Sequence, residues 1–332
     1  AAVENFAGMG LSLLEISHRS KEFVAVNDEA RALIKELLDV PAGYEVVFMG
    51  GGASMQFCMV PYNLLNKKAS YLDTGTWASN AIKEAKLFGE VDVVASSKDK
   101  NYTYIPKGYA IADDSDYFHF TSNNTIYGTE MRKDPDVKQR LVCDMSSDIF
   151  SRPIDISKYD IIYAGAQKNM GIAGLGVAII REDLLQDVAQ TTPVLLDYKL
   201  MIKNDSMYNT PPAYAIYVLG LVLEWIDSLG GLEVMKERNE KKAKLIYDYL
   251  DQSTFYKAHS DKENRSLMNV TFTTPNKDLD AKFVKESIEA GMTNLKGHRS
   301  VGGIRASIYN AMPYEGVEKL VAFMKEFEEN NR

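Results

Sequence analysis

The sequence predicts an α/β protein with a large domain built on a mostly parallel sheet and a smaller C-terminal α+β domain. From residue 46 to about 180, short apolar runs alternate with glycine-rich turns and helix-like segments, as in parallel sheets covered by helices. After Gly230-Gly231 the chain changes to long charged helical segments. Its 332 residues are enough for about two domains. We expect a large domain at 1–235 and a small domain at 236–332. The first few residues belong either to the large domain or to the small one.

The elements of the large domain follow from these runs. Between the first two predicted strands, helices are expected at 54–65 and 77–88, the second closed by Gly89 as its C-cap. Ligands of such sheets bind beyond the carboxyl ends of the strands. Strands are predicted at 46–49, 91–95, 117–121, 141–144, 161–164 and 176–180. The polar residues at their ends are Ser54, Thr125, Asp144 and Lys168.

The second half of the chain begins with a helix that Pro211-Pro212 opens and Gly230-Gly231 stops. A long charged helix is expected next, at 234–251. The remainder predicts a strand at 268–273, a helix at 279–290, a glycine-punctuated stretch at 296–308 and an amphipathic helix at 314–328.

The composition narrows the function classes. Hydrophobic residues at 45% and charged residues at 25% are ordinary for globular domains and argue against a disordered or membrane protein. A net charge of -8 argues against a nucleic-acid partner but allows a local cationic pocket for a small anion. The start carries no secretory pattern, and Cys58 and Cys143 lie in apolar runs. We therefore expect a cytoplasmic protein with no disulfide or metal site.

The segment at 50–54, Gly-Gly-Gly-Ala-Ser, follows a predicted strand and opens a predicted helix. Small residues there expose backbone N–H groups that, with the helix dipole, can hold a phosphate. The segment lacks the Gly-Lys-Ser/Thr of a P-loop and the spacing of a dinucleotide fold. A tight turn with close packing explains it about equally well.

Lys168 and Asp144 are the candidates for chemistry. Lys168 follows the strand at 161–164 and precedes a second apolar run, so it is expected to be desolvated. Desolvation lowers the pKa of a lysine toward the nucleophilic amine that a Schiff base requires. Asp144 ends a strand, where it is either a helix cap or the partner of a protonated pyridine nitrogen.

Several short segments occur in the order typical of one enzyme family. They are Ser-His-Arg-Ser-Lys-Glu-Phe at 17–23, Gly-Gly-Ala-Ser-Met-Gln-Phe at 51–57, Gly-Thr-Trp-Ala at 75–78, Asn-Thr-Ile-Tyr-Gly at 124–128, Ser-Arg-Pro at 151–153, Ala-Gly-Ala-Gln-Lys-Asn at 164–169, Asn-Thr-Pro-Pro at 209–212 and Gly-His-Arg-Ser-Val-Gly-Gly-Ile-Arg-Ala-Ser at 297–307. On these segments the chain resembles the phosphoserine aminotransferases, a family of class V aminotransferases, over nearly its whole length. The resemblance implies the aspartate-aminotransferase-like fold of pyridoxal 5'-phosphate (PLP) enzymes, fold type I.

The resemblance also implies the cofactor site. Lys168 would form the Schiff base with PLP and move the substrate proton, Asp144 would hold the pyridinium, and Trp77 would stack on the ring. Without the resemblance, a core or interface aromatic is the simpler interpretation of Trp77. The remaining implied contacts are Thr125 at the ring hydroxyl, Ala53, Ser54 and Gln167 at the phosphate, and Asn209 and Thr210 reaching that phosphate from a second subunit. The active unit would then be a homodimer with shared sites.

Two His-Arg-Ser tripeptides, at 18–20 and 298–300, stand near opposite ends of a chain with only 4 histidines. Arginine forks are the usual device for carboxylates and phosphates, although solvated surface pairs are the simpler alternative. The resemblance assigns Arg305 to the substrate α-carboxylate. It assigns His18, Arg19, His298 and Arg299 to the distal carboxylate or phosphate.

The implied reaction is reversible amino transfer from glutamate to 3-phosphohydroxypyruvate, giving phosphoserine for serine biosynthesis. A phosphorylated hydroxythreonine precursor of pyridoxine is a second implied substrate. The alternatives are another class V enzyme, such as an alanine:glyoxylate aminotransferase or a cysteine desulfurase, and a PLP-binding protein without catalysis. A desulfurase needs a cysteine on a loop, which neither Cys58 nor Cys143 provides. The lysine, the aspartate and the arginines argue against a non-catalytic protein.

Overall fold

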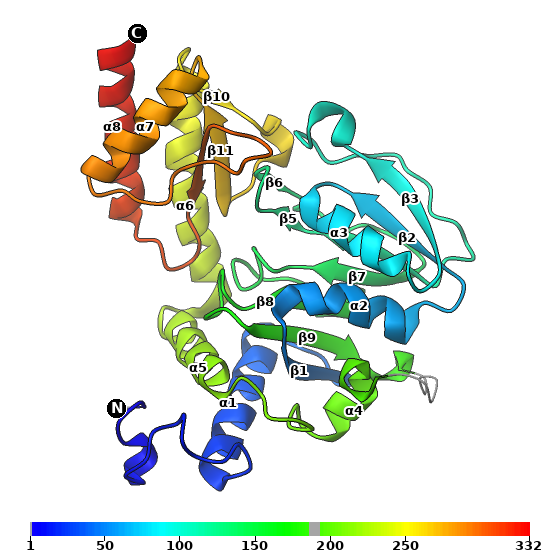
Figure 1. Ribbon diagram of the computed structural model, residues 1–332. Coiled ribbons are helices and arrows are strands. Elements are labelled where there is room, and N and C mark those ends of the chain that lie inside the picture. Colours follow the sequence, from blue (N-terminus) through cyan, green and yellow to red (C-terminus); the bar gives the residue numbers. More distant parts are fainter. Residues whose placement is uncertain (1, 186–192) are drawn as a thin grey trace.

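The computed structural model describes residues 2–185 and 193–332 (Figure 1). Its main sheet has the strand order β1-β9-β8-β7-β4-β2-β3, and β9 runs antiparallel to both of its neighbours while the other pairs are parallel. The strands are β1 (Tyr44–Gly50), β2 (Lys68–Asp73), β3 (Glu90–Ser96), β4 (Tyr117–Thr121), β7 (Arg140–Asp144), β8 (Ile161–Gly165) and β9 (Leu175–Arg181). The predicted α/β class and mostly parallel sheet are confirmed.

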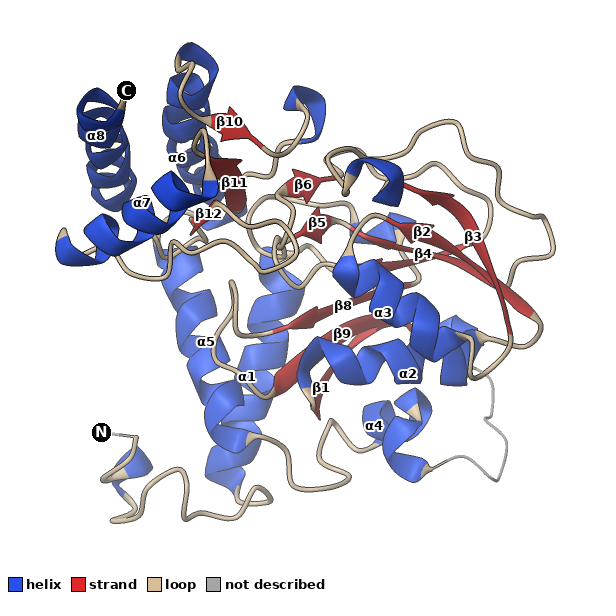
Figure 2. Ribbon diagram, turned by 45° about the horizontal axis from the view of Figure 1, so that its top comes forward, coloured by secondary structure: helices blue, strands red, loops and turns tan. Residues whose placement is uncertain are grey.

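Helices cover both faces of this sheet (Figure 2). Successive residues of one strand point to opposite faces, so Val46 packs in a core with α1 and α5, and Val47 packs in a core with α2 and α3. Burial on both faces is why the strands read as continuous apolar runs. The helices of this part are α1 (Lys21–Leu37), α2 (Gly52–Leu64), α3 (Thr76–Ala85), α4 (Tyr198–Lys203) and α5 (Ala213–Ser228). A short hairpin, β5 (Asn123–Asn124) and β6 (Thr129–Glu130), forms a separate two-stranded sheet after β4.

The C-terminal part is a three-stranded antiparallel sheet with helices, as expected. Its core is rich in phenylalanine, with Phe272, Phe283 and Phe327 in edge-to-face contact. Its elements are α6 (Gly231–Gln252), β10 (Lys257–Ala258), β11 (Asn269–Thr273), α7 (Lys277–Glu289), β12 (Ile304–Ser307) and α8 (Tyr314–Asn331).

Helix α6 joins the two parts without a break at residue 235. Met235 packs in the large core and Ala243 in the small core. Near the N-terminus, Leu13 packs in the large core and the Phe6 ring contacts Tyr217 of α5 at 5.7 Å. The division at 235/236 remains a prediction. Among the described helices, none is long and apolar enough by itself to cross a bilayer; α5 and α6 satisfy that test only as a pair bent by 84°.

Two local predictions of the large domain require correction. Gly89 is not the C-cap of α3, which ends at Ala85 with Lys86 as its cap. Instead Gly89 packs tightly, because a Cβ there would lie 3.0 Å from the Leu65 side chain. Strand β2 was not predicted, because its sequence, Lys-Ala-Ser-Tyr-Leu-Asp, mixes polar residues into a strand that is almost wholly buried.

Candidate active site

The carboxyl ends of β1, β7 and β8 meet at one edge of the sheet, where they surround a cavity of about 330 Å³. Asp144 is the last residue of β7, Lys168 follows β8, and Ser54 lies in the first turn of α2 after β1. The predicted site residues that line the cavity are Ala53, Ser54, Trp77, Asp144, Gln167 and Lys168. One cavity therefore brings together six residues that the sequence distributes over 116 positions, 53 to 168.

Two glycines bring the N-terminus of α2 directly onto the sheet. A Cβ on Gly176 of β9 would lie 2.9 Å from the Gly52 carbonyl oxygen, and a Cβ on Gly165 of β8 would lie 3.3 Å from the Ala53 nitrogen. Only glycine permits this approach. The first N–H groups of an α-helix have no partner within the helix, so those of Ala53 and Ser54 are available to an anion in the cavity.

The Lys168 amine is held inside this site. Its Nζ donates a 2.6 Å hydrogen bond to Thr125 Oγ1 and lies 5.9 Å from the centre of the Trp77 ring. Burial lowers the pKa of Lys168; the Asp144 carboxylate opposes this, and the Arg305 guanidinium lowers the pKa further. The net shift favours the neutral amine, which is the nucleophilic and basic form.

The Asp144 carboxylate is buried and oriented by one residue. Its Oδ1 accepts hydrogen bonds from the Ser146 nitrogen at 2.9 Å and from Ser146 Oγ at 2.6 Å. Ser146 Oγ in turn accepts from the Gly165 nitrogen at 3.0 Å, so its own hydrogen points to Asp144. Burial raises the pKa of Asp144, while the Ser146 bonds and the Lys168 charge lower it. With Oδ1 occupied by two donors, Oδ2 is the oxygen left for a ligand.

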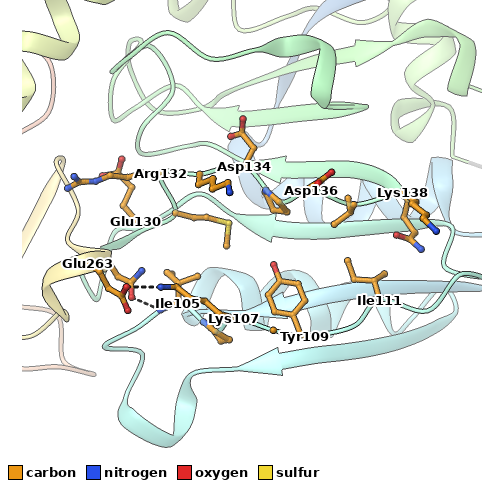
Figure 3. Close-up of a pocket in the computed structure, with 18 of the residues that line it drawn as sticks. Ile105, Lys107, Tyr109, Ile111, Glu130, Arg132, Asp134, Asp136, Lys138 and Glu263 are labelled. Atoms are coloured by element: carbon orange, nitrogen blue, oxygen red, sulfur yellow. Dashed lines mark hydrogen bonds and ion pairs between the residues drawn. The ribbon is translucent and has the colours of Figure 1, made fainter.

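A larger cavity, of about 800 Å³, lies elsewhere (Figure 3). It runs between the segments 105–113 and 130–139 and ends at Glu263, which pairs with Lys107 at 2.6 Å. Its lining contains none of the predicted site residues. The chemistry of the side chains, rather than the size of the hollow, therefore identifies the active site.

The arginine that the resemblance assigns to the α-carboxylate carries a charge that acts on the lysine. Arg305 lies on β12, its Nε is buried without a hydrogen-bond partner among the described residues, and its charge lowers the pKa of Lys168. After burial, the same charge is the main cause that lowers the pKa of His298. Arg299 is exposed and lines a separate surface hollow beside α7.

The other predicted residues lie outside the cavity of their own chain. Asn209 and Thr210 are exposed, as is Arg19. Thr210 and His18 line a shallow hollow of about 470 Å³, and the Nε2 of His18 is buried without a partner among the described residues. The structure of one chain thus separates these residues from Lys168.

Sequence reasoning missed several residues that line the site, namely Phe57, Thr121, Asn123, Ser146, Ser147 and Gly174. Ser146 had a usable signal, because an Asp followed two residues later by Ser commonly forms a side-chain turn. Phe57 ends the family segment at 51–57, and the others come from positions that carry no local pattern.

Comparison with known proteins agrees with this geometry. Residues 3–320 match the family described as aminotransferase class-V. A phosphoserine aminotransferase of Parabacteroides distasonis is 72% identical over 333 aligned residues, which cover 100% of this chain and 94% of the relative.

Two solved structures are also closely similar. The phosphoserine aminotransferase of Bacillus circulans subsp. alkalophilus is 48% identical with a TM-score of 0.96, over 98% of this chain and 92% of that one. A PLP-bound phosphoserine aminotransferase of Trichomonas vaginalis is 40% identical with a TM-score of 0.94, over 97% and 93%. The chain therefore belongs to the phosphoserine aminotransferase family of the class V aminotransferases.

Proposed function

We propose that the chain catalyses reversible amino transfer from glutamate to 3-phosphohydroxypyruvate, giving O-phosphoserine and 2-oxoglutarate. The observation that carries the proposal is the desolvated Lys168 amine, held by Thr125 in a cavity that also contains a buried carboxylate and a helix N-terminus. Formation of phosphoserine would serve serine biosynthesis.

The two free cysteines are Cys58 in α2 and Cys143 in β7. Free cysteines support the cytoplasmic location that we propose with this function. Their places in a helix and a strand argue against a desulfurase, which needs a cysteine on a loop.

The residues of the cavity fit the family's cofactor, PLP. An amine of lowered pKa suits the aldehyde of PLP, Asp144 Oδ2 suits a protonated pyridine nitrogen, and the free N–H groups of α2 suit a phosphate. The Trp77 indole, whose Nε1 is buried without a partner among the described residues, provides a flat apolar wall. When bound, PLP supplies the electron sink that acidifies the substrate α-carbon.

Each side chain of the site then has its own role in the reaction. Arg305 binds the α-carboxylate and so places the α-carbon of either amino acid. With PLP held in the cavity, Lys168 Nζ would be the base that moves the proton of that carbon. Thr125 Oγ1 accepts a hydrogen bond from the amine and thereby limits its rotation. The Ser146 donors stabilise the Asp144 carboxylate against the effect of burial, so this carboxylate would hold a protonated pyridine nitrogen.

We propose that two chains share their active sites. Asn209 and Thr210 are too exposed to serve their own chain's cavity, and they stand immediately before Pro211-Pro212, which fixes the backbone that presents them. Large apolar side chains are exposed around the hollow that Thr210 lines, including Leu14 at 65% and Ile172 at 38%. An apolar surface next to exposed residues that are predicted to bind the cofactor supports a second copy as the partner.

Mixed dimers test this arrangement. An Asn209→Ala/Thr210→Ala chain and a Lys168→Ala chain are each expected to be almost inactive alone, because one lacks phosphate contacts and the other lacks the amine. When they are mixed, each heterodimer regains one intact site, so about half of the wild-type activity per heterodimer is expected. Activity is measured after native mass spectrometry has established that heterodimers form. Heterodimers without activity would refute shared sites.

The substrate is argued from charge. A general aminotransferase needs one cation for the α-carboxylate, whereas this chain adds two His-Arg pairs, His18-Arg19 and His298-Arg299. Arg19 and Arg299 are exposed in one chain, which leaves their guanidinium groups free for a distal phosphate or carboxylate. Burial, and then the charge of neighbouring arginines, lowers the pKa of His18 and of His298, so the arginines are the main source of positive charge at both pairs.

Selective loss of anionic substrates tests this assignment. Arg19→Ala and Arg299→Ala should each lower kcat/KM for phosphoserine and glutamate by roughly 30- to 200-fold, because each loses a charge-assisted hydrogen bond. Any slow reaction with alanine should be spared, since alanine has no distal anion. Equal losses on all three substrates, or alanine transfer as fast as phosphoserine transfer in the unsubstituted enzyme, would favour an alanine:glyoxylate-type activity instead.

A further inference from the structure

Three buried asparagines connect the segment that carries Lys168 to the segment that carries Arg305. Asn169, which follows Lys168, accepts a 3.1 Å hydrogen bond at its Oδ1 from the backbone nitrogen of Asn310. Asn310 accepts at its Oδ1 a 2.8 Å bond from Nδ2 of Asn239 in α6. Their exposed fractions are 5%, 2% and 0% for Asn169, Asn310 and Asn239. We call this chain of side chains the asparagine network.

The same three amides hold the loop after Asp144. Asn169 Nδ2 contacts the Ser147 and Ile149 carbonyl oxygens at 3.4 and 3.3 Å. The next two carbonyl oxygens are held from the C-terminal part of the chain. Asn310 Nδ2 donates to the Phe150 oxygen at 2.9 Å, and Asn239 Nδ2 donates to the Ser151 oxygen at 3.1 Å. The network therefore joins three parts of the active site: the aspartate loop, the lysine turn and the arginine strand.

The backbone of this loop contains one residue in an unfavourable conformation. Phe150 has a φ of 59° and is 1% exposed. A left-handed conformation is unfavourable for a bulky residue, so it persists only where the surroundings determine it. Asn310 bonds the carbonyl of Phe150 itself, and Asn239 bonds the next one. The asparagine network thus holds the two carbonyl groups at the strained position of this loop.

A lysine fixes the other side of the connection. Lys242, one helical turn after Asn239 on α6, donates from its Nζ to the Ile308 and Tyr309 carbonyl oxygens at 3.0 and 2.8 Å. These carbonyls lie between Arg305 and Asn310 in the sequence. The end of β12 is therefore clamped between α6 and the lysine turn, and Arg305 has little freedom to move relative to Lys168.

We propose that Asn169, Asn239 and Asn310 are positioning residues that set the placement of Arg305 relative to Lys168. An amino acid whose α-carboxylate is bound by Arg305 must present its α-hydrogen to the Lys168 amine. Proton transfer is sensitive to misplacement of the reacting atoms by about 1 Å, which lowers rates by about 100-fold. The network supplies that alignment through the backbone on both sides. This inference rests on the proposed function, because it requires an α-proton transfer.

Asn310→Ala tests the inference, because it removes both side-chain bonds of Asn310 and keeps its backbone nitrogen for Asn169. PLP should still bind with an unchanged visible spectrum. With saturating glutamate, kcat should fall about 10- to 100-fold. The primary isotope effect measured with glutamate deuterated at the α-carbon should rise, because a misaligned proton transfer limits the rate. In the cofactor-free protein, amide hydrogen exchange at residues 147–151 should become faster.

Asn239→Ala is the second variant, since it removes the other donor to the loop and the bond to Asn310 Oδ1. The Asn239→Ala/Asn310→Ala double variant should lose little more activity than either single variant, because the two side chains act through one connection. Asn27→Ala is the matched control. Asn27 is 0% exposed and bonds the Asp205 carbonyl oxygen at 3.1 Å, within the α1 region of the large core. The control should lower the unfolding temperature and leave kcat and the isotope effect unchanged.

The result that overturns the inference is distinct from failure of the proposed function. If Asn310→Ala and Asn239→Ala lower the unfolding temperature as Asn27→Ala does, with kcat and the isotope effect unchanged, the network is structural only. If the unsubstituted protein itself does not exchange the α-hydrogen of glutamate, the proposed function fails.

Discussion

Lys168→Ala is expected to lose amino transfer by about 10⁴-fold, because it removes both the amine that bonds to the cofactor and the base that moves the α-proton. Stopped-flow measurement of the glutamate half-reaction detects this loss. Lys68→Ala is the matched control, since Lys68 is also partly buried but begins β2 at the opposite edge of the sheet. The control should keep its rate within about twofold.

Added small amines separate chemistry from folding in this variant. If Lys168→Ala retains its fold and lacks only the amine, methylamine should restore part of the proton-transfer rate in proportion to its concentration. A Lys168→Ala protein with undiminished turnover would contradict the role assigned to this residue.

Asp144→Asn is expected to bind PLP and to lose about 10²- to 10³-fold in kcat, on the scale of removing one preorganised electrostatic partner. The amide cannot keep a pyridine nitrogen protonated, so the cofactor becomes a weaker electron sink. The rate of the glutamate half-reaction with PLP-saturated protein measures the loss. An unchanged rate would leave Asp144 as a structural residue that caps its turn through Ser146.

The cofactor-free Asp144→Asn variant should be at least as stable as the unsubstituted protein, although it is less active. Burial raises the pKa of Asp144, so in the cofactor-free protein the unfolded state accommodates the ionised carboxylate more easily than the folded state does. That destabilising contribution is present above the folded-state pKa and disappears as the carboxyl is protonated at lower pH. Cofactor-free Asp144→Asn is therefore expected to unfold at an equal or higher temperature than the unsubstituted protein at pH 7, and the difference should shrink on acidification.

The main sheet could be predicted because most of its strands are buried on both faces and so are uniformly apolar. β4 (Tyr117–Thr121) coincides with its predicted bounds, and β8 (Ile161–Gly165) differs by one residue. β2 was not predicted because the hydrogen bonds of its polar residues come from other parts of the chain. Ser70 bonds Ser115, and Asp73 accepts hydrogen bonds from Ser79 and Ser96. Such partners are invisible to a pattern based on alternation or hydropathy.

Some residues of the candidate site could be predicted from the sequence, and others could not. Lys168 and Asp144 were recognisable because Asp144 ends an apolar strand and Lys168 follows one, and parallel strands bring their carboxyl ends to one edge. The effect of the Arg305 charge on Lys168 could not be predicted from spacing, because Arg305 lies in the C-terminal sheet and Lys168 follows a strand of the main sheet. The asparagine network was likewise not predicted, since its bonds join residues 20 to 160 positions apart.

One measurement tests the central claim most directly. The purified protein is saturated with PLP and freed of excess cofactor, and its visible spectrum is followed as glutamate and then 3-phosphohydroxypyruvate are added. Glutamate should change the absorbance of the bound cofactor with release of one 2-oxoglutarate per site, and 3-phosphohydroxypyruvate should restore the original spectrum with formation of one phosphoserine. A spectrum that glutamate does not change, or one that pyruvate or glyoxylate restores as fast as 3-phosphohydroxypyruvate does, would contradict the assignment.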